Sequence, residues 1–233
     1  SICGDVAKRV GVDAPATIVG NTDKTAVRLL ALAQEEGKSL HKTHKWSALI
    51  RTQTVTTADG TATYALPSDF YAYIPSTGWN DTQNRPIIGS LTGQQWQFVK
   101  NSAAVSSAFN QKFRVQWDTS NSARRLTIYP TPSAVETLYL EYLSTDWCQS
   151  SGGTGQSAWA ADDDTGRLDE ELITLGLKWR YLKVIGMVYD IELEEYMGRL
   201  RAAKANDAPP TILRMNAGSG EVFPNLSDGG YGA

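Results

Sequence analysis

The sequence predicts an α+β protein: a helical bundle formed by an N-terminal helix and a C-terminal helical hairpin, a central antiparallel β-sheet or meander, and an extended C-terminal tail. Apolar residues recur at spacings of three and four near both ends of the chain, and β-branched and aromatic residues gather between them. The pair Pro209 and Pro210 blocks any further helix. The expected parts are the N-terminal helical part (1–50), the β-rich region (51–150), the helical hairpin that completes the bundle (151–208) and the tail (209–233).

The composition is that of an ordinary globular protein. The 233 residues are 41% hydrophobic and 20% charged, and 22 Lys plus Arg against 25 Asp plus Glu give a net charge of −3. No basic run is present, which argues against a protein that grips nucleic acid by its phosphates. No apolar run reaches about 18 residues and the start lacks a signal-peptide pattern, so we expect neither a membrane span nor export. Cys3 and Cys148 are expected to be free thiols.

The N-terminal part predicts a short helix over residues 2–10 that ends at Gly11, a loop, and then a longer helix that ends near His44 and Trp46. Asn21 and Thr22 are the expected N-cap candidates of the longer helix. Its apolar and small residues fall on one stripe, which should be buried: Ala26, Leu29, Leu30, Ala33, Gly37 and Leu40.

The central region predicts strands. Residues 51–57 and 61–64 flank the turn Asp59-Gly60 and are expected to form a β-hairpin. Further strands are expected at 70–74, 85–88, 113–117, 126–129 and 135–143, and the segments 126–129 and 138–142 are expected to be neighbours in a meander. Residues 91–100 predict a short helix, capped by Ser90, that places Trp96 on a sheet.

A helical hairpin is predicted at residues 168–208. Asp169, Glu170 and Glu171 crowd the first turn of its first helix, which Gly186 ends before Asp190 caps the next. Two apolar stripes nearly surround the first helix, so part of its contact could come from another subunit. The second stripe comprises Ile173, Leu177, Tyr181 and Val184, and the expected core or subunit-interface residues are Leu172, Leu175, Trp179, Leu182, Leu193, Tyr196 and Leu200. Glu195 and Arg199 are expected to pair on the outside.

The tail contains isolated apolar residues and five glycines between 211 and 233. These apolar residues are too irregularly spaced to build a core but suffice to anchor an extended peptide on a partner. Arg214 adds a forked hydrogen-bond donor. The expected anchors are Ile212, Leu213, Arg214, Met215, Val222, Phe223 and Leu226.

No catalytic, metal or cofactor site is expected. His41 and His44 share a helix face but have no convincing third metal ligand. The run Asp162-Asp163-Asp164 does not keep the register of a calcium loop, and Gly37-Lys38-Ser39 lacks the earlier glycine of a phosphate-binding loop.

The order of short motifs resembles the head-to-tail adaptor proteins of short-tailed bacteriophages, also called head completion or tail tubular protein A-like proteins. The resemblance covers most of the chain and rests on segments that are each weak alone. They are Asp5-Val6-Ala7 to Gly11-Val12, Thr17 to Asn21, Ala33, Trp46, Tyr64-Ala65-Leu66-Pro67-Ser68-Asp69-Phe70, Arg85-Pro86-Ile87, Leu126 to Pro130 with Pro132, Tyr142-Leu143-Ser144, and Leu177-Lys178-Trp179-Arg180-Tyr181.

The resemblance implies a structural virion protein. Such a chain forms a ring, typically of twelve copies, that docks beneath the portal protein, continues the DNA channel without binding DNA specifically, and meets the tail nozzle protein. It implies assembly in the host cytoplasm, a final place in the virion neck, and portal docking by the tail residues.

Two other functions remain open from the sequence. Some members of the wider adaptor group have been proposed to degrade peptidoglycan, for which Asp162 to Asp164, Glu170 and Glu171 would be the candidate carboxylates. A receptor- or glycan-binding tail accessory would instead use exposed aromatic residues such as Trp79, Trp147 and Trp159.

Overall fold

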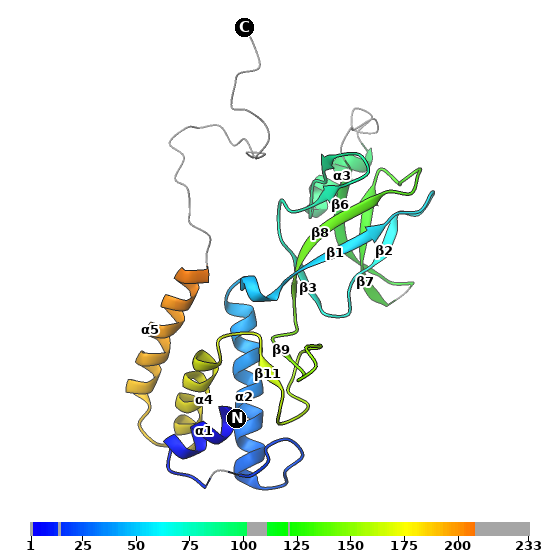
Figure 1. The fold of residues 1–233 in the computed structure, drawn as a ribbon. Helices are drawn as coiled ribbons and strands as arrows, with labels where there is room; N and C mark the ends of the chain where they lie inside the picture. The colour runs from blue at the N-terminus through cyan, green and yellow to red at the C-terminus, as the bar shows by residue number, and fades with distance from the viewer. Residues whose placement is uncertain (1, 14, 102–110, 121, 208–233) are drawn as a thin grey trace, which may run out of the picture.

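The computed structural model describes residues 2–13, 15–101, 111–120 and 122–207. It combines helices with antiparallel sheets, which confirms the α+β class (Figure 1). Helices α1, α2, α4 and α5 gather at one end of the molecule, and the two larger sheets and α3 lie at the other. The elements are α1 (Ile2–Arg9), α2 (Lys24–Thr43), the 3-10 helix η1 (Ser47–Leu49), β1 (Ile50–Thr56), β2 (Thr63–Ala65), β3 (Phe70–Tyr73), β4 (Trp79–Asn80), β5 (Arg85–Pro86), α3 (Gly93–Asn101), β6 (Lys112–Asp118), β7 (Ala123–Tyr129), β8 (Thr137–Ser144), β9 (Cys148–Gln149), β10 (Gly155–Gln156), β11 (Thr165–Gly166), α4 (Glu170–Ile185) and α5 (Asp190–Asp207).

The strands form three sheets instead of one meander. The largest has the order β1-β8-β4-β5, with β3 also paired to β8; the others are β2-β7-β6 and the small sheet β10-β9-β11, which the sequence did not predict. The pairing of 126–129 with 138–142 was wrong, because β7 and β8 belong to different sheets. The core between the two larger sheets contains Val55, Ile87, Phe113, Leu126, Ile128, Leu138 and Leu140.

The predicted hairpin around Asp59-Gly60 was also wrong. Gly60 does make a turn, with φ of 71°. However, β1 pairs with β8 in the register Val55↔Leu138, and β2 pairs with β7 in the register Thr63↔Thr127. The connection over residues 57–62 is longer than a tight hairpin loop, so it leaves each strand free to find a distant partner of matching apolar pattern.

Two helix caps differ from the prediction. Asp23, instead of Asn21 or Thr22, caps α2 by accepting hydrogen bonds from the backbone N–H groups of Thr25 and Ala26. Thr92, instead of Ser90, stands at the start of α3, where its hydroxyl accepts from the Gln95 N–H and the Gln95 side chain accepts from the Thr92 N–H. Helix α3 buries Trp96 against Tyr129 of β7, with ring centroids 6.3 Å apart.

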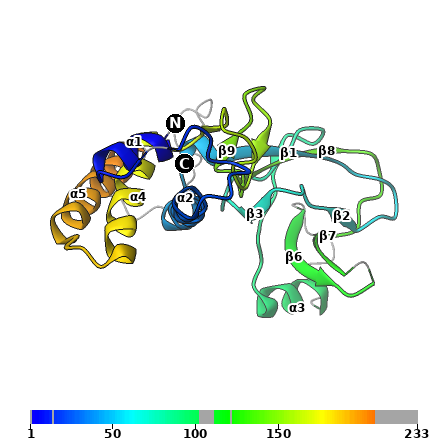
Figure 2. The same ribbon diagram turned by 90° about the horizontal axis from the view of Figure 1, so that it is seen from below.

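The helices share one core, in which α4 packs against α1, α2 and α5. Figure 2, seen from below, shows α5, α4 and α2 in a row, with α5 at the outer edge and α2 nearest β9. Asp169 caps α4, and Gly186 ends it with φ of 78°. Asp190 is the first residue of α5 and does not precede it, and Val184 is 52% exposed, so both expectations were wrong. No helix in the described part of the chain has the length and apolar character needed to cross a membrane.

Candidate functional site

A buried charged cluster joins three helices. Glu36 of α2 is fully buried and accepts hydrogen bonds from Arg180 Nε of α4 at 2.6 Å and from the Tyr196 hydroxyl of α5 at 2.6 Å. Gly176 makes room for this carboxylate, since a Cβ there would lie 2.4 Å from it. Burial, followed by the bond to Glu36, raises the pKa of Tyr196, which keeps the phenol protonated as a donor. The cluster therefore fixes α2, α4 and α5 relative to one another.

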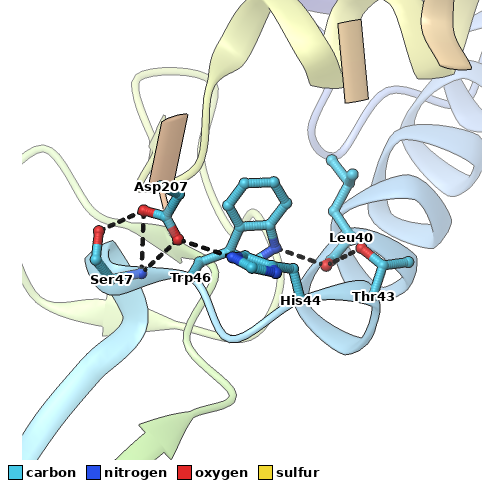
Figure 3. Close-up of polar contacts among 6 residues, drawn as sticks. All are labelled: Leu40, Thr43, His44, Trp46, Ser47 and Asp207. Carbon is cyan, nitrogen blue, oxygen red and sulfur yellow. Dashed lines mark hydrogen bonds and ion pairs between the residues drawn. The ribbon is translucent and has the colours of Figure 1, made fainter. Parts of the chain in front are cut away.

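A second polar junction fixes the end of α5 (Figure 3). The Asp207 carboxylate accepts from the Ser47 hydroxyl at 2.5 Å and from its backbone N–H at 3.0 Å, and it lies 3.2 Å from His44 Nε2. The Trp46 indole and the Thr43 hydroxyl both donate to the Leu40 carbonyl. The junction therefore holds the last residue of α5 against the corner where the chain passes from α2 to β1.

The same junction brings Ser, His and Asp together without the order that hydrolysis requires. In a catalytic triad the imidazole lies between the hydroxyl and the carboxylate, so that it can remove the hydroxyl proton. Here Asp207 lies between Ser47 and His44, and it is the carboxylate that accepts the hydrogen bond from the Ser47 hydroxyl. The arrangement is therefore a structural clamp and does not activate a nucleophile.

Another buried carboxylate organises the β-rich region. Glu136 accepts hydrogen bonds from the side-chain amides of Asn80, Gln83 and Gln111, and its backbone N–H donates to the Thr57 hydroxyl. These bonds join the start of β8 to the turn between β4 and β5. Sequence reasoning missed both buried glutamates, because their partners lie far away along the chain.

Most of the carboxylates considered for peptidoglycan cleavage accept hydrogen bonds from backbone N–H groups. Asp162 accepts from the N–H groups of Ile18 and Val19, and Asp164 accepts from those of Ala160 and Ala161. Glu170 accepts from the Gly166 N–H. Asp162, Asp163, Asp164 and Glu170 also line a pocket of about 220 Å³, together with Cys3 and Trp159.

Glu171 forms the ion pair with Arg199 that the sequence predicted for Glu195. It pairs with Arg199 at 2.7 Å, and Arg199 also reaches Asp169 at 3.4 Å. The expected pair between Glu195 and Arg199 was therefore wrong, because the start of α4 offers Arg199 two carboxylates.

The aromatic residues considered for glycan binding are poorly placed for it. Trp147 is fully buried and Trp159 is 8% exposed, which contradicts their expected exposure. Their rings pack edge to face with centroids 5.0 Å apart, under α2. Trp79 is half-buried in β4. The three rings therefore do not form an exposed binding platform.

No group of three or more His, Cys, Asp or Glu side chains within the described residues is arranged to hold a metal ion. Cys3 and Cys148 are free, as expected; both are also buried, and burial raises the pKa of each thiol to about 12. Neither thiol is therefore placed to act as a nucleophile or ligand at neutral pH.

The predicted interaction residues fall into two groups. Five of the seven hairpin residues, Leu172, Leu175, Leu182, Tyr196 and Leu200, are buried in the chain's own core. Trp179 and Leu193 pack against that core and are partly buried. The tail residues Ile212, Leu213, Arg214, Met215, Val222, Phe223 and Leu226 lie outside the described residues.

Sequence comparison gives the family. No curated protein matches the chain. The family model described as SU10 adaptor protein matches residues 2–214, which include both larger sheets, all five α-helices and both polar junctions. This family is one of structural virion proteins, and membership indicates a bacteriophage head–tail adaptor located in the virion neck, in contact with portal and tail components. The chain therefore belongs to the SU10 adaptor protein family.

Proposed function

We propose that this chain is the subunit of a ring, of twelve copies, that joins the portal protein to the tail nozzle protein of a short-tailed phage. The family match over residues 2–214 is the observation that carries the proposal. The ring assembles in the host cytoplasm and continues the DNA channel from the capsid into the tail.

The charge of the subunit supports a channel through which DNA slides. With a net charge of −3 and no basic run in the sequence, the subunit as a whole has no excess of positive charge to hold phosphates. A lumen of this character repels the duplex weakly and leaves it free to move during ejection.

The helical part and the tail have different roles in this proposal. The helices and their buried Glu36 cluster form the rigid body of the subunit. The tail, residues 209–233, docks on the portal through Ile212, Leu213, Arg214, Met215, Val222, Phe223 and Leu226. The Asp207 junction supports this division, because it fixes the starting point of the tail to the folded body.

A phage that lacks the gene for this chain provides the test. Electron cryomicroscopy should show filled heads without tails, and supplying the chain should restore tailed particles with a ring of density at the neck. Tailed, infectious particles in the absence of the chain would contradict the proposed function.

A further inference from the structure

Helix α2 presents a positively charged stripe that has no partner within the described chain. Its exposed residues recur every three or four positions and so lie on one face: Lys24, Val27, Arg28, Ala31, Glu35, Lys38 and Lys42. The acid among them, Glu35, is held by Arg180 at 2.7 Å. No ion pair in the described part of the chain engages the four cations. Val27 is 50% exposed between them.

Helix α5 presents a complementary outer face. Seven of its exposed residues share one side of the helix: Ile191, Glu194, Glu195, Gly198, Ala202 and Ala205, with Arg201 at the margin. Ile191 is 77% exposed, and the two glutamates have no ion pair among the described residues. This face is therefore acidic and apolar in its first half and lined by small residues in its second half.

Gly198 supports a close approach of another chain to this face. Glycine in the middle of a helix is unfavourable relative to alanine by about 1 kcal/mol. A Cβ added at Gly198 would meet nothing within 4 Å, so no contact within the described chain requires the glycine. A second helix packed against α5 would use the space that the missing side chain leaves.

We propose that the outer face of α5 packs against the exposed stripe of α2 in the next copy of this chain. The inference rests on the proposed ring and names its subunit contact. Glu194 and Glu195 meet the cations of α2, and Ile191 covers apolar surface near Val27. The two faces are also similar in length, because 20 and 18 helical residues span about 30 and 27 Å.

The positions of the two helices suit a ring. Figures 1 and 2 both show α5 and α2 at opposite ends of the row that they form with α4. A contact between two different faces is heterologous, so it repeats from copy to copy and closes into a ring when the rotation permits. A two-fold dimer would instead need one face to be complementary to itself.

Disulfide cross-linking of the full-length protein tests the contact. Ala31→Cys marks α2 and Gly198→Cys marks α5, while the native Cys3 and Cys148 are buried and their raised pKa of about 12 keeps them unreactive. Oxidation of the double variant at high concentration should give a ladder of oligomers. A mixture of the two single variants should stop at dimers, and each single variant alone should remain uncross-linked.

Two results would overturn the contact. Gly198→Cys alone forming dimers would show a two-fold contact, and a double variant that forms rings in the electron microscope without cross-links would place the interface elsewhere. The proposed function is judged separately, on tailed particles. Cross-links with no ring at the neck would contradict the proposed function alone, and a ring at the neck without cross-links would contradict the contact alone.

Charge reversal supplies an independent measurement. Glu194→Lys with Glu195→Lys should lower the yield of oligomers, trapped by a charge-independent cross-linker, by about tenfold, and adding Lys24→Glu with Arg28→Glu, the cations nearest Val27, should restore it. The matched control reverses two exposed acids of the β-rich region, Asp59→Lys with Asp81→Lys, and should leave the yield unchanged. Equal losses in the control and the α5 variant, or no rescue, would contradict the assigned faces.

Discussion

At the scale of single residues, the most informative feature is a carboxylate in an apolar stripe. Glu36 falls between Ala33 and Leu40 at spacings of three and four, on the buried side of α2. This position is the one signal in the sequence that the residue is buried. Its partners Arg180 and Tyr196 lie 144 and 160 positions away, so no local pattern could identify them.

The Glu36 cluster gives a prediction for stability. Glu36→Ala removes the buried acceptor of both Arg180 and Tyr196 and leaves Arg180 with only the exposed Glu35 as its partner, which should lower the free energy of unfolding by about 3 to 5 kcal/mol. Glu35→Ala is the matched control, because this neighbour binds the same arginine from an exposed position and should cost less than about 1 kcal/mol. Urea unfolding measures both; equal losses would show that burial does not set the strength of the cluster.

A histidine in the same helix makes stability depend on pH. His41 is 5% exposed, its Nδ1 lies 2.9 Å from the Lys38 carbonyl, and its Nε2 has no hydrogen-bond partner in the described structure. Burial, with a smaller contribution from Lys42, lowers the pKa of His41. At pH values between the pKa of His41 in the folded protein and its unfolded value of about 6.5, the unfolded chain binds more protons than the folded chain. The free energy of unfolding should therefore have its full value above about pH 6.5 and should fall as the pH drops below that value.

The measurement is the free energy of unfolding between pH 7.5 and pH 5.5. His41→Gln should flatten this dependence, whereas His44→Gln, which changes the other histidine of the chain, should retain it. A His41→Gln profile as steep as that of the unchanged protein would assign the pH dependence to other groups.

At the scale of elements, helices could be predicted because their signals are local. The spacing of Ala26, Leu29, Ala33 and Leu40 located α2, and Gly186 located the end of α4. Strands were located but their partners were not, since the choice of β8 as the neighbour of β1 depends on residues about 90 positions away. The turn at Gly60 predicted that the two strands beside it pair with each other, but the connection between β1 and β2 is too long to require this pairing.

Substitution of two mid-helix glycines by alanine should change the stability of the fold in opposite directions. A Cβ at Gly37 in α2 would lie 2.5 Å from the ring of the fully buried Trp147, so Gly37→Ala should destabilise the fold by about 1 to 3 kcal/mol. A Cβ at Gly198 in α5 meets nothing, so Gly198→Ala should stabilise the isolated subunit by about 0.5 to 1 kcal/mol. Thermal melting checks both, and two shifts of the same sign would contradict the assigned packing.

At the scale of the whole molecule, the described residues form a folded body that ends next to the proposed docking segment. Residues 2–207 form two apolar cores and the junctions at Glu36 and Asp207. The sequence could predict where the helical hairpin ends, because Pro209 and Pro210 cannot continue it. It could not predict the clamp between Asp207 and Ser47, which lie 160 positions apart and share no local motif.

The last prediction concerns deletion of residues 211–233. The apolar residues of this segment are too few and too irregularly spaced to build a core, so the truncated protein should keep its helix content, and its melting temperature should remain nearly unchanged. It should nevertheless fail to attach to the portal and leave filled heads that leak DNA, because it loses all seven proposed anchors. Circular dichroism and the yield of tailed particles measure the two effects separately.

A shorter deletion, of residues 216–233, divides the anchors. It keeps the run Ile212, Leu213, Arg214 and Met215, the strongest candidate because three apolar side chains and a forked donor are consecutive there. If this run dominates docking, the shorter deletion should retain most of the tailed particles and the longer one should abolish them. If both truncated proteins join heads to tails at the normal yield, the portal-docking surface lies in the folded body, and if both fail, docking depends on Val222, Phe223 and Leu226.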